Sequence, residues 1–406
     1  MVTLNDNLMC CGCSACVNVC PTKCIELKED NEGFLVPFFV EGTKCINCSK
    51  CEEVCPVINT IPEKEHFEKA YIVQNTDQKV RRESTSGGMW SAIASTVLAN
   101  GGVVFGAMFD KDFNVIHAEI KTHNELSKSR NSKYVQSNLK NTYTEALNYL
   151  KEGKTVLFSG TPCQIEGLKN FVGNYENLIT VDMVCYGIAS PLIFRKYLEF
   201  QNRKPDKIYF RNKHNGYKFT TMSFFENDKE VYFNGSESDR YLRAYLSNNA
   251  LRKHCYNCNF KKRYRISDFT LSDCFYPFVF NKDFDDDKGT TSVLVNSKKG
   301  IDLLKEMLEK GIIRAFEVSP YEMIKGDYYM IASAKYGDKR DVFLSEANSL
   351  SGNELFDKYF PDTAKIKLMR IARKLMLTFG IYRFIRNHRY LRYLKKVDEI
   401  NKGRFK

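Results

Sequence analysis

Two cysteine runs with the same internal spacing lie near the start of this 406-residue chain. Each run has cysteines at positions i, i+3, i+6 and i+10, and a proline follows the fourth cysteine. The cysteines are Cys10, Cys13, Cys16 and Cys20 in the first run, and Cys45, Cys48, Cys51 and Cys55 in the second. Where two 4Fe-4S clusters are held with this spacing, each cluster takes three thiolates of one run and the fourth of the other. The pattern therefore predicts one cluster on Cys10, Cys13, Cys16 and Cys55, and another on Cys45, Cys48, Cys51 and Cys20.

Disulfide bonds and zinc are the other uses that such cysteines have. A disulfide framework is typical of short secreted chains, whereas this chain is long and is expected to have no leader sequence. Zinc sites commonly take two separate CxxC pairs, whereas each run here offers four cysteines at one fixed pitch. We therefore expect a two-cluster 4Fe-4S unit of the ferredoxin type. Cys11 and Cys24 lie outside the pattern and are predicted to pack near the clusters.

Composition indicates a reducing, intracellular setting. Fifteen cysteines in a chain of this length, with cluster spacing, favour a reducing compartment. The first residues lack the basic and apolar segments of a signal peptide, and no apolar run reaches the ~20 residues of a membrane-spanning helix. We therefore expect a cytoplasmic protein.

The excess positive charge lies entirely in the last tenth of the chain. Residues 363–406 hold 14 Lys or Arg and 2 Asp or Glu, which equals the net charge of +12 for the whole protein. Apolar residues recur there at helical spacing, which predicts a basic amphipathic tail that Gly380 divides into two helices. These apolar residues are Leu368, Ile371, Leu375, Phe379 and Tyr382. Such a tail lies on the inner face of an anionic membrane, docks on a partner, or packs on its own protein, and the sequence leaves these alternatives open. Sequence-specific nucleic-acid binding is not expected, because no base-reading module accompanies the charge.

The body of the chain alternates strand-like and helix-like segments from residue 70 onward. The strand-like segments are 70–74, 103–109, 115–120, 155–159, 178–184, 266–275 and 290–296, and the helix-like segments are 89–101, 145–153, 162–172, 190–204, 239–254 and 300–311. This alternation predicts an α/β fold with a mostly parallel sheet, which the strand-rich stretch 207–235 enlarges as a β-rich insertion. The predicted domains are a ferredoxin-like α+β unit (1–62), a linker (63–69), the α/β domain (70–362) and the helical tail (363–406).

A second set of cysteines lies in the body, outside the paired runs. These are Cys163, Cys185, Cys255, Cys258 and Cys274. Cys163 falls in the first turn of a predicted helix, where the free N–H groups and the helix dipole favour a thiolate. Cys185 follows a predicted strand, and Cys255 and Cys258 form a CxxC on a loop. Four sulfurs from three segments suit a third 4Fe-4S cluster, while a zinc site and unrelated buried thiols remain alternatives.

Six stretches of the body carry a family resemblance, and they occur in the family's order. They are STSGG (84–88), GGVVFGAMFD (101–110), SKYVQS (132–137), VLFSGTPCQIEGLK (156–169), LRKHCYNCNFK (251–261) and DKGTTSVLVN (287–296). With them the chain resembles the coenzyme F420 hydrogenase/dehydrogenase beta-subunit family over roughly residues 70–300. That family includes subunits that reduce a deazaflavin coenzyme and enzymes that reduce chlorophyll precursors.

The resemblance implies an FAD-bearing α/β domain with its own 4Fe-4S cluster. The implied ligands are Cys163, Cys185, Cys255 and Cys258. The chain departs from the family's motifs at three places: Tyr186 stands where VCHG has its histidine, Ser272–Tyr276 replaces ADFWG, and Asn131 replaces a glycine before SKYVQS. The first two departures put the family's usual substrate chemistry in doubt and leave Cys274 as a rival ligand.

Polar loops that open helices are the candidates for binding the flavin. A Ser/Gly loop before a helix offers backbone N–H groups and a helix dipole to a pyrophosphate, and nearby basic side chains neutralise its charge. The candidate residues are Ser84, Ser86, Gly87, Gly88, Arg130, Lys133, Gln136, Ser137, Gly160 and Thr161. No GxGxxG motif follows a strand, so a standard dinucleotide-binding domain is not predicted.

Few residues are candidates for acid–base chemistry. Asp273, beside the body cysteines, is the predicted catalytic residue. His117 is expected to pack within a strand, and His214 and His254 are expected to be solvated loop residues.

These features predict an iron–sulfur flavoprotein oxidoreductase that passes electrons through 4Fe-4S clusters to FAD, for two-electron reduction of an organic substrate or soluble cofactor. The alternative is an electron-transfer subunit that serves a partner enzyme and has no substrate of its own. The expected partners are a redox protein or soluble electron carrier, and a small-molecule substrate or a deazaflavin-like cofactor.

Overall fold

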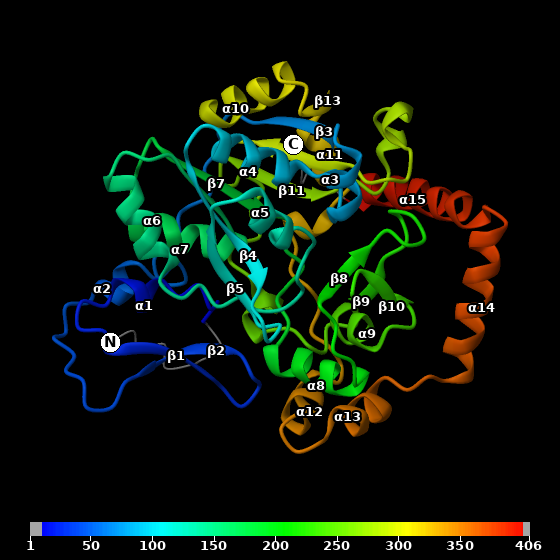
Figure 1. Cartoon of the computed structure of the whole chain (residues 1–406), viewed down its shortest axis with the longest axis horizontal. Coiled ribbons are helices and arrows are strands. Elements are labelled where there is room, and N and C mark those ends of the chain that lie inside the picture. Colours follow the sequence, from blue (N-terminus) through cyan, green and yellow to red (C-terminus); the bar gives the residue numbers. More distant parts are fainter. Residues whose placement is uncertain (1–9, 401–406) are drawn as a thin grey trace.

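The computed structural model describes residues 10–400. A small N-terminal unit lies against one side of a large α/β body, and the two C-terminal helices lie on the opposite side (Figure 1). The predicted α/β class is confirmed, together with the small N-terminal unit, the β-rich insertion and the helical tail.

The N-terminal unit repeats one local structure twice. Its elements are α1 (Ala15–Val19), β1 (Ile25–Glu29), β2 (Leu35–Phe39) and α2 (Lys50–Glu53). Each helix begins directly after a serine in the left-handed conformation, Ser14 (φ 61°) and Ser49 (φ 57°). Each serine lies between the second and third cysteines of its run, so the same turn aims successive sulfurs in both runs. The strands β1 and β2 pair antiparallel between the two runs.

An eight-stranded sheet forms the centre of the body. Its strands are β3 (Lys69–Asn75), β4 (Val103–Phe109), β5 (Val115–Ile120), β6 (Val156–Ser159), β7 (Leu178–Met183), β11 (Phe269–Asp273), β12 (Thr291–Val295) and β13 (Ile313–Val318). They lie in the order β13-β3-β12-β11-β7-β6-β4-β5. The four central strands, from β11 to β4, pair in parallel, and the pairings towards both edges are antiparallel. The central strands are rich in buried Val, Leu, Ile and Phe, as expected where helices cover both faces of a sheet.

Helices cover the two faces of this sheet differently. The helices are α3 (Gln78–Glu83), α4 (Met89–Ala99), α5 (His123–Ser129), α6 (Thr142–Lys151), α7 (Pro162–Val172) and α10 (Lys298–Glu309). One core joins α4, α5 and α10 to the sheet. The other core joins α6 and α7 to the sheet and also includes apolar residues of the N-terminal unit. The N-terminal unit therefore packs on the α6–α7 face.

The β-rich insertion and several helices form a third packed region. The elements are α8 (Pro191–Gln201), β8 (Lys207–Asn212), β9 (Thr221–Glu226), β10 (Lys229–Gly235), α9 (Arg240–Leu246), α12 (Arg340–Glu346) and α13 (Gly352–Tyr359). The three strands form an antiparallel sheet in the order β10-β9-β8. Aromatic side chains fill the shared core, with Tyr197 and Tyr241 fully buried among phenylalanines.

The helix expected over 239–254 is shorter than predicted. α9 ends at Leu246, and the chain resumes as a 3-10 turn at Lys253–Asn257. Asn248 lies between them in the left-handed conformation (φ 66°), which stops the helix. In the body, the elements that the sequence did not predict are β13, α3, α5, α11 (Pro320–Lys325), α12 and α13.

The tail forms two helices, as predicted, and the break lies at Gly380. α14 (Ala364–Thr378) and α15 (Ile381–Ile400) are joined through Gly380 at φ 68°, a conformation that glycine adopts at little cost. Within residues 10–400, no helix is long and apolar enough to span a membrane.

Candidate metal centres

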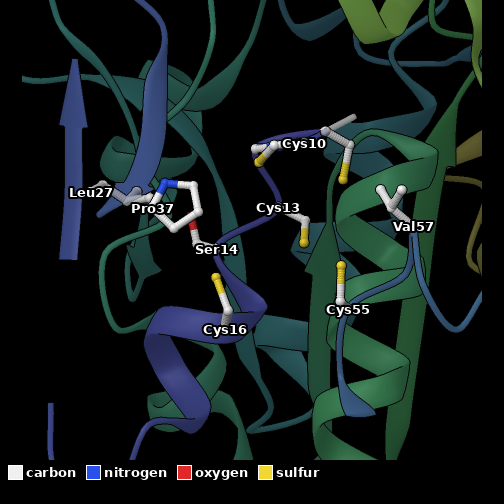
Figure 2. Close-up of a pocket in the computed structure, with 10 residues that line it drawn as sticks. Cys10, Cys13, Ser14, Cys16, Leu27, Pro37, Cys55 and Val57 are labelled. Atoms are coloured by element: carbon white, nitrogen blue, oxygen red, sulfur yellow. The ribbon is translucent and has the colours of Figure 1, made fainter. Parts of the chain in front are cut away.

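The first sulfur-lined pocket contains the predicted ligands of the first cluster. Cys10, Cys13, Cys16 and Cys55 all line it, with Leu27, Pro37 and Val57 as apolar walls. Figure 2 shows the sulfurs of Cys13 and Cys55 pointing toward each other from different segments, with Cys16 on the first helix nearby. The fourth cysteine of the second run thus joins three cysteines of the first, in the combination predicted from spacing.

The second pocket contains the other four predicted ligands. Cys20, Cys45, Cys48 and Cys51 line it. Cys24 lines it too, and its sulfur lies 3.4 Å from that of Cys20. Each pocket therefore takes three predicted ligands from one run and the fourth from the other run. Cys11 and Cys24 pack beside these ligands, as predicted.

The chemistry of the first pocket suits a positively charged centre. Burial raises the pKa of Cys16 well above its usual value, and the nearby sulfurs of Cys10 and Cys55 raise it further. Buried thiols that repel one another as thiolates need a cation before they ionise, and an iron–sulfur cluster supplies it. The residues of this pocket therefore fit such a cluster.

The body brings four further cysteines together. Cys163 lies in the first turn of α7, Cys185 follows β7, and Cys255 and Cys258 lie at the 3-10 turn. Burial raises the pKa of Cys185 to about 12, and the sulfurs of Cys163 and Cys258 contribute. Burial likewise raises the pKa of Cys255, with Cys185, Cys258 and Cys163 adding to the shift. The charges of these four sulfurs therefore act on one another, and their burial suits a cluster by the same argument. The third cluster stays a prediction.

No group of His, Cys, Asp or Glu within residues 10–400 converges closely enough to hold a single metal ion. Cys274 lies in a different core from the four body cysteines, with Ile72, Phe284 and Met323. The groups that shift its pKa are Ser292, Asp273 and Asp285, in addition to burial, which raises it to about 12. This placement favours the four-cysteine set implied by the resemblance over a set that includes Cys274.

Cys11 connects the first pocket to the body cysteines. Its thiol lines the pocket, and Cys163 packs against the buried cluster that contains Cys11 and Cys13. The interaction with Cys13 raises the pKa of Cys11 well above its usual value, and the interaction with Cys163 opposes this shift. Cysteines of the two sets therefore pack in one core.

Helix α7 positions both sets. Thr161 precedes it and Pro162 occupies its first turn, while the backbone N–H of Thr161 donates to Oε1 of Gln164 at 2.9 Å. These are the start signals that the sequence predicted. One turn after Cys163, a Cβ on Gly167 would lie 3.0 Å from the sulfur of Cys13. The absence of a side chain at this position allows the N-terminal unit to approach α7 closely.

Polar contacts fix the N-terminal unit on the body. Nε of Arg252 donates to the carbonyl oxygen of Cys10 at 2.7 Å. The amide of Gln136 pairs with the backbone of Leu35 in both directions, at 2.8 and 3.0 Å. Lys262 and Glu166 form a buried ion pair at 2.5 Å, and Lys262 also donates to the carbonyl oxygen of Ile61. Gln136, predicted as a flavin contact, is thus engaged at this interface, and its flavin role stays a prediction.

The Ser/Gly loop predicted to bind phosphate lies beside the SKYVQS segment. Oγ1 of Thr85 accepts the backbone N–H of Ser132 at 2.7 Å. Ser86 and Gly87 bond to Oγ1 of Thr291, both at 2.9 Å. Ser84 bonds instead to the carbonyl oxygen of Val80. The loop is therefore held between two segments that carry the family motifs, and Gly88 starts α4 from its end.

The predicted basic residues already have partners. Arg130 forms an ion pair with Glu83 at 2.5 Å. The amine of Lys133 donates to three backbone carbonyls at the end of α5, and burial lowers its pKa to about 7. Phosphate neutralisation by these two residues stays a prediction.

Ser137 and Ser159, the residue before Gly160, lie on either side of a buried histidine. His117, on β5, lies 2.5 Å from Oγ of Ser137 and 2.9 Å from the carbonyl oxygen of Ser159. Burial lowers the pKa of His117 to about 4, so the ring is neutral at physiological pH. His117 packs within its strand as expected. His254 is buried, contrary to the expectation of a solvated loop, because it packs against Phe260.

Asp273 belongs to a buried polar cluster at the end of β11. It accepts hydrogen bonds from Arg211 at 2.8 Å and from the hydroxyl of Tyr217 at 3.0 Å. Burial opposes the charge on Arg211, but Asp273 and Tyr134 outweigh it and raise the pKa of Arg211. Among the described residues, none accepts a hydrogen bond from Nη2 of Arg211, although this atom is buried. An orphaned guanidinium N–H of this kind suits a ligand with an acceptor atom.

Lys213 connects this cluster to the Ser/Gly loop. Its amine donates to the carbonyl oxygens of Arg81 and Ser86, both at 2.6 Å. Burial lowers the pKa of Lys213 to about 7. The sequence reasoning missed Arg211, Lys213 and Tyr217. The only available signal was their position in the strand-rich stretch 207–235.

Comparisons with known proteins match two regions of the chain. Residues 9–70 match the 4Fe-4S dicluster domain, and residues 153–320 match the C-terminal domain family of the coenzyme F420 hydrogenase/dehydrogenase beta subunit. A chain of the xenon-derivatised F420-reducing [NiFe] hydrogenase complex from Methanosarcina barkeri is 15% identical, with a TM-score of 0.45 over 73% of this chain and 94% of that chain. No curated protein matches. The protein thus joins an N-terminal 4Fe-4S dicluster domain to a C-terminal domain of this beta-subunit family, which confirms the predicted family.

Proposed function

We propose that this protein is an iron–sulfur flavoprotein oxidoreductase. In this proposal electrons enter at the two N-terminal centres and serve the two-electron reduction of an organic substrate or soluble cofactor in the body. The observation that carries the proposal is the shared packing of the two cysteine sets: Cys163 and Cys258 of the body pack against the buried cluster that contains Cys11 and Cys13 of the N-terminal unit. The predicted entry centre and the body cysteines therefore belong to one packed region.

Three sets of cysteines would hold the iron. Cys10, Cys13, Cys16 and Cys55 would hold one cluster, and Cys20, Cys45, Cys48 and Cys51 the second. Cys163, Cys185, Cys255 and Cys258 would hold a third. When bound, 4Fe-4S clusters supply one-electron transfer. The chain's own contribution is to bury Cys10, Cys13 and Cys55 and to fix the N-terminal unit on the body through α7 and Arg252.

A polar region around the Ser/Gly loop would hold the flavin. The Ser/Gly loop (84–88), its neighbour Ser132 and the buried Arg211 form one polar region, to which Lys213 is bonded. The orphaned Nη2 of Arg211 supports a ligand with acceptor atoms in this region. Gly160 and Thr161 would approach the same flavin from the start of α7. When bound, FAD supplies the exchange between one-electron and two-electron chemistry.

Proton transfer would fall to the groups around Asp273. Arg211 and Tyr217 both donate to this carboxylate, so Asp273 is held in place as a hydrogen-bond acceptor. Lys213, with its pKa lowered to about 7 by burial, exchanges a proton readily at neutral pH. In this proposal Asp273 holds the Arg211 guanidinium in position. Lys213 is the group that gives or takes the proton during the reaction.

Anaerobic purification with counts of iron and flavin tests the proposal. We expect about 12 Fe per chain from three four-iron clusters, bound flavin, and flavin-dependent reduction of acceptor dyes. A panel of organic acceptors that includes a deazaflavin would then identify the substrate class. Bound zinc in place of iron, or a preparation that retains no flavin after reconstitution, would refute the proposal.

A further inference from the structure

The C-terminal helices carry a charge that the rest of the protein does not share. Residues 364–397 contain 11 Lys or Arg and no Asp or Glu. Three of the arginines are paired with carboxylates, Arg370 with Asp362, Arg373 with Glu237 and Arg383 with Asp285. Among the described residues, no ion pair involves Lys365, Lys367, Lys374, Arg389, Arg392 or Lys395. The tail therefore presents a surplus of unpaired positive charge to the solvent.

Helix α14 presents an apolar stripe to the solvent. Leu368, Ile371, Leu375 and Phe379 recur at helical spacing and are exposed, Leu368 by 67% and Phe379 by 71%. No residue of α14 is buried, so this stripe does not pack on the protein. By helical periodicity, Lys365 lies on one side of the stripe, and Lys367 and Lys374 lie on the other. An apolar stripe between basic flanks is the pattern of a helix that lies in a membrane interface.

Helix α15 attaches the tail to the body through its opposite face. Tyr390 stacks on Tyr276 with ring centroids 3.6 Å apart, and Arg386 donates to the hydroxyl of Tyr276 at 3.1 Å. Val397 is buried in the core that contains Cys274. The outward face carries Ile381 and Phe384, and Phe384 is 73% exposed. One face of α15 is thus fixed, and the other faces the solvent.

The exposed apolar residues concentrate at the corner between the two helices. Phe379 directly follows α14, Gly380 makes the turn, and Ile381 and Phe384 lie in the first turn of α15. Figure 1 shows this corner at the edge of the molecule, on the side away from the N-terminal unit. A protruding apolar corner with basic helices on both sides can insert between lipid headgroups without burying a charge.

We propose that α14 and the outward face of α15 dock this protein on an anionic phospholipid surface, with Phe379 and Phe384 inserted at the headgroup boundary. The occupant is a membrane because the unpaired charge is all of one sign and continues along both helices, which suits a diffuse field of anionic headgroups. A second copy of this tail would bring positive charge against positive charge. The proposal is independent of the substrate and of the function proposed above.

Vesicle co-sedimentation of the full-length protein tests this proposal. We expect binding to vesicles of equal parts phosphatidylglycerol and phosphatidylcholine, little binding to phosphatidylcholine alone, and weaker binding as the salt concentration rises. Replacing Lys365, Lys367 and Lys374 by glutamine should weaken binding about fivefold per residue, on the order of 100-fold in total. The double variant F379S/F384S should weaken it by at least about tenfold, because apolar insertion is lost.

Matched controls separate this effect from general charge and surface changes. The triple variant K111Q/K151Q/K305Q removes the same charge from exposed positions of the body, and F67S removes an exposed phenylalanine far from the tail along the chain. Both controls should bind the anionic vesicles as the unaltered protein does. Equal binding to both kinds of vesicle, or equal losses in tail and control variants, would overturn the proposal. It would also be overturned if the protein ignores vesicles and forms a dimer that the F379S/F384S variant cannot form.

Discussion

The N-terminal unit and the body gather cysteines in different ways. In the N-terminal unit, three of the four predicted ligands at each pocket come from one short run, and the same serine turn precedes each helix. In the body, the four sulfurs come from α7, from the end of β7 and from a 3-10 turn far along the chain. A local pattern builds the first arrangement, whereas the folded sheet builds the second.

This difference extends to what stabilises each region. Around the second pocket, the buried apolar residues among those described are Cys24, Ile25 and Cys51. The body has large cores on both faces of its sheet and a third in the aromatic region. Small units without a sufficient core depend on metals or cross-links for their stability. We therefore infer that iron stabilises the fold of the N-terminal unit, whereas the body folds by apolar burial.

Removal of iron should give the largest effect on stability, and it should unfold the N-terminal unit while the body stays folded. In small metal-binding domains the free energy of metal binding is free energy of folding. After anaerobic chelation, we expect backbone amides in β1, β2 and α2 to lose their protection from hydrogen exchange. Amides in β4, β6 and β7 should keep theirs. Hydrogen exchange measured by mass spectrometry checks this, and equal loss in both regions would break the comparison.

Acid should give the next largest effect, and it should act on the body. The pKa of His117 is lowered from 6.5 to about 4 by burial, so between these values the unfolded chain binds a proton that the folded chain does not. Stability is therefore full above pH 6.5 and falls as the pH falls, by about 1.4 kcal/mol per pH unit from this residue. Residues 10–56 contain no histidine. Urea unfolding followed by the fluorescence of Trp90, the single tryptophan, reports on the body.

The variant His117→Asn is the control for the acid prediction. This variant should be less stable than the unaltered protein at pH 7, because its side chain no longer bonds both Ser137 and Ser159. Between pH 6.5 and pH 5, its free energy of unfolding should fall by about 2 kcal/mol less than that of the unaltered protein. If the variant has the same slope as the unaltered protein, another group is responsible and the prediction is wrong.

The smallest effect should come from Gly167, at the boundary between the two regions. Alanine has a higher helix propensity than glycine by about 1 kcal/mol, so Gly167→Ala would stabilise an isolated helix. Here the added Cβ would lie 3.0 Å from the sulfur of Cys13, and we expect a net destabilisation of about 1 kcal/mol in the iron-loaded protein. Iron-free protein should tolerate the change better, because its thiol is free to move.

Chemical unfolding of both forms measures this effect. The variant Asn148→Ala, at an exposed position within α6, serves as the matched control and should be slightly stabilising in both forms. A Gly167→Ala protein that is more stable than the unaltered one when loaded with iron would show that α7 and Cys13 are not in tight contact.

The same contrast explains how much could be predicted from the sequence. The spacing of the paired runs sufficed to group eight cysteines around two pockets, because ligands within one run are neighbours in the chain. Thr161, Pro162 and Gly380 marked helix ends correctly, because capping and glycine conformations are local. The α/β class followed from the alternation of apolar strands and helices.

What depends on distant contacts could not be predicted in the same way. The orphaned Arg211 and its contact with Asp273 join the β-rich insertion to β11, and no local pattern announces this pairing. The packing of Cys163 against the cluster that contains Cys11 and Cys13 depends on how the N-terminal unit sits on α7. Arg130 and Lys133 carried the right charge for phosphate, yet Glu83 and the end of α5 engage them. Similarly, α9 stops early because Asn248 takes a left-handed conformation within an otherwise helical pattern.

The central claim is that the body carries its own iron–sulfur centre beside those of the N-terminal unit. Iron counts on the anaerobically purified variant C255A/C258A test it most directly, because these cysteines lie outside both N-terminal pockets. We expect about 12 Fe per chain in the unaltered protein and about 8 in the variant, with the N-terminal amides still protected from exchange. An equal count of about 8 Fe per chain in both proteins would contradict the claim.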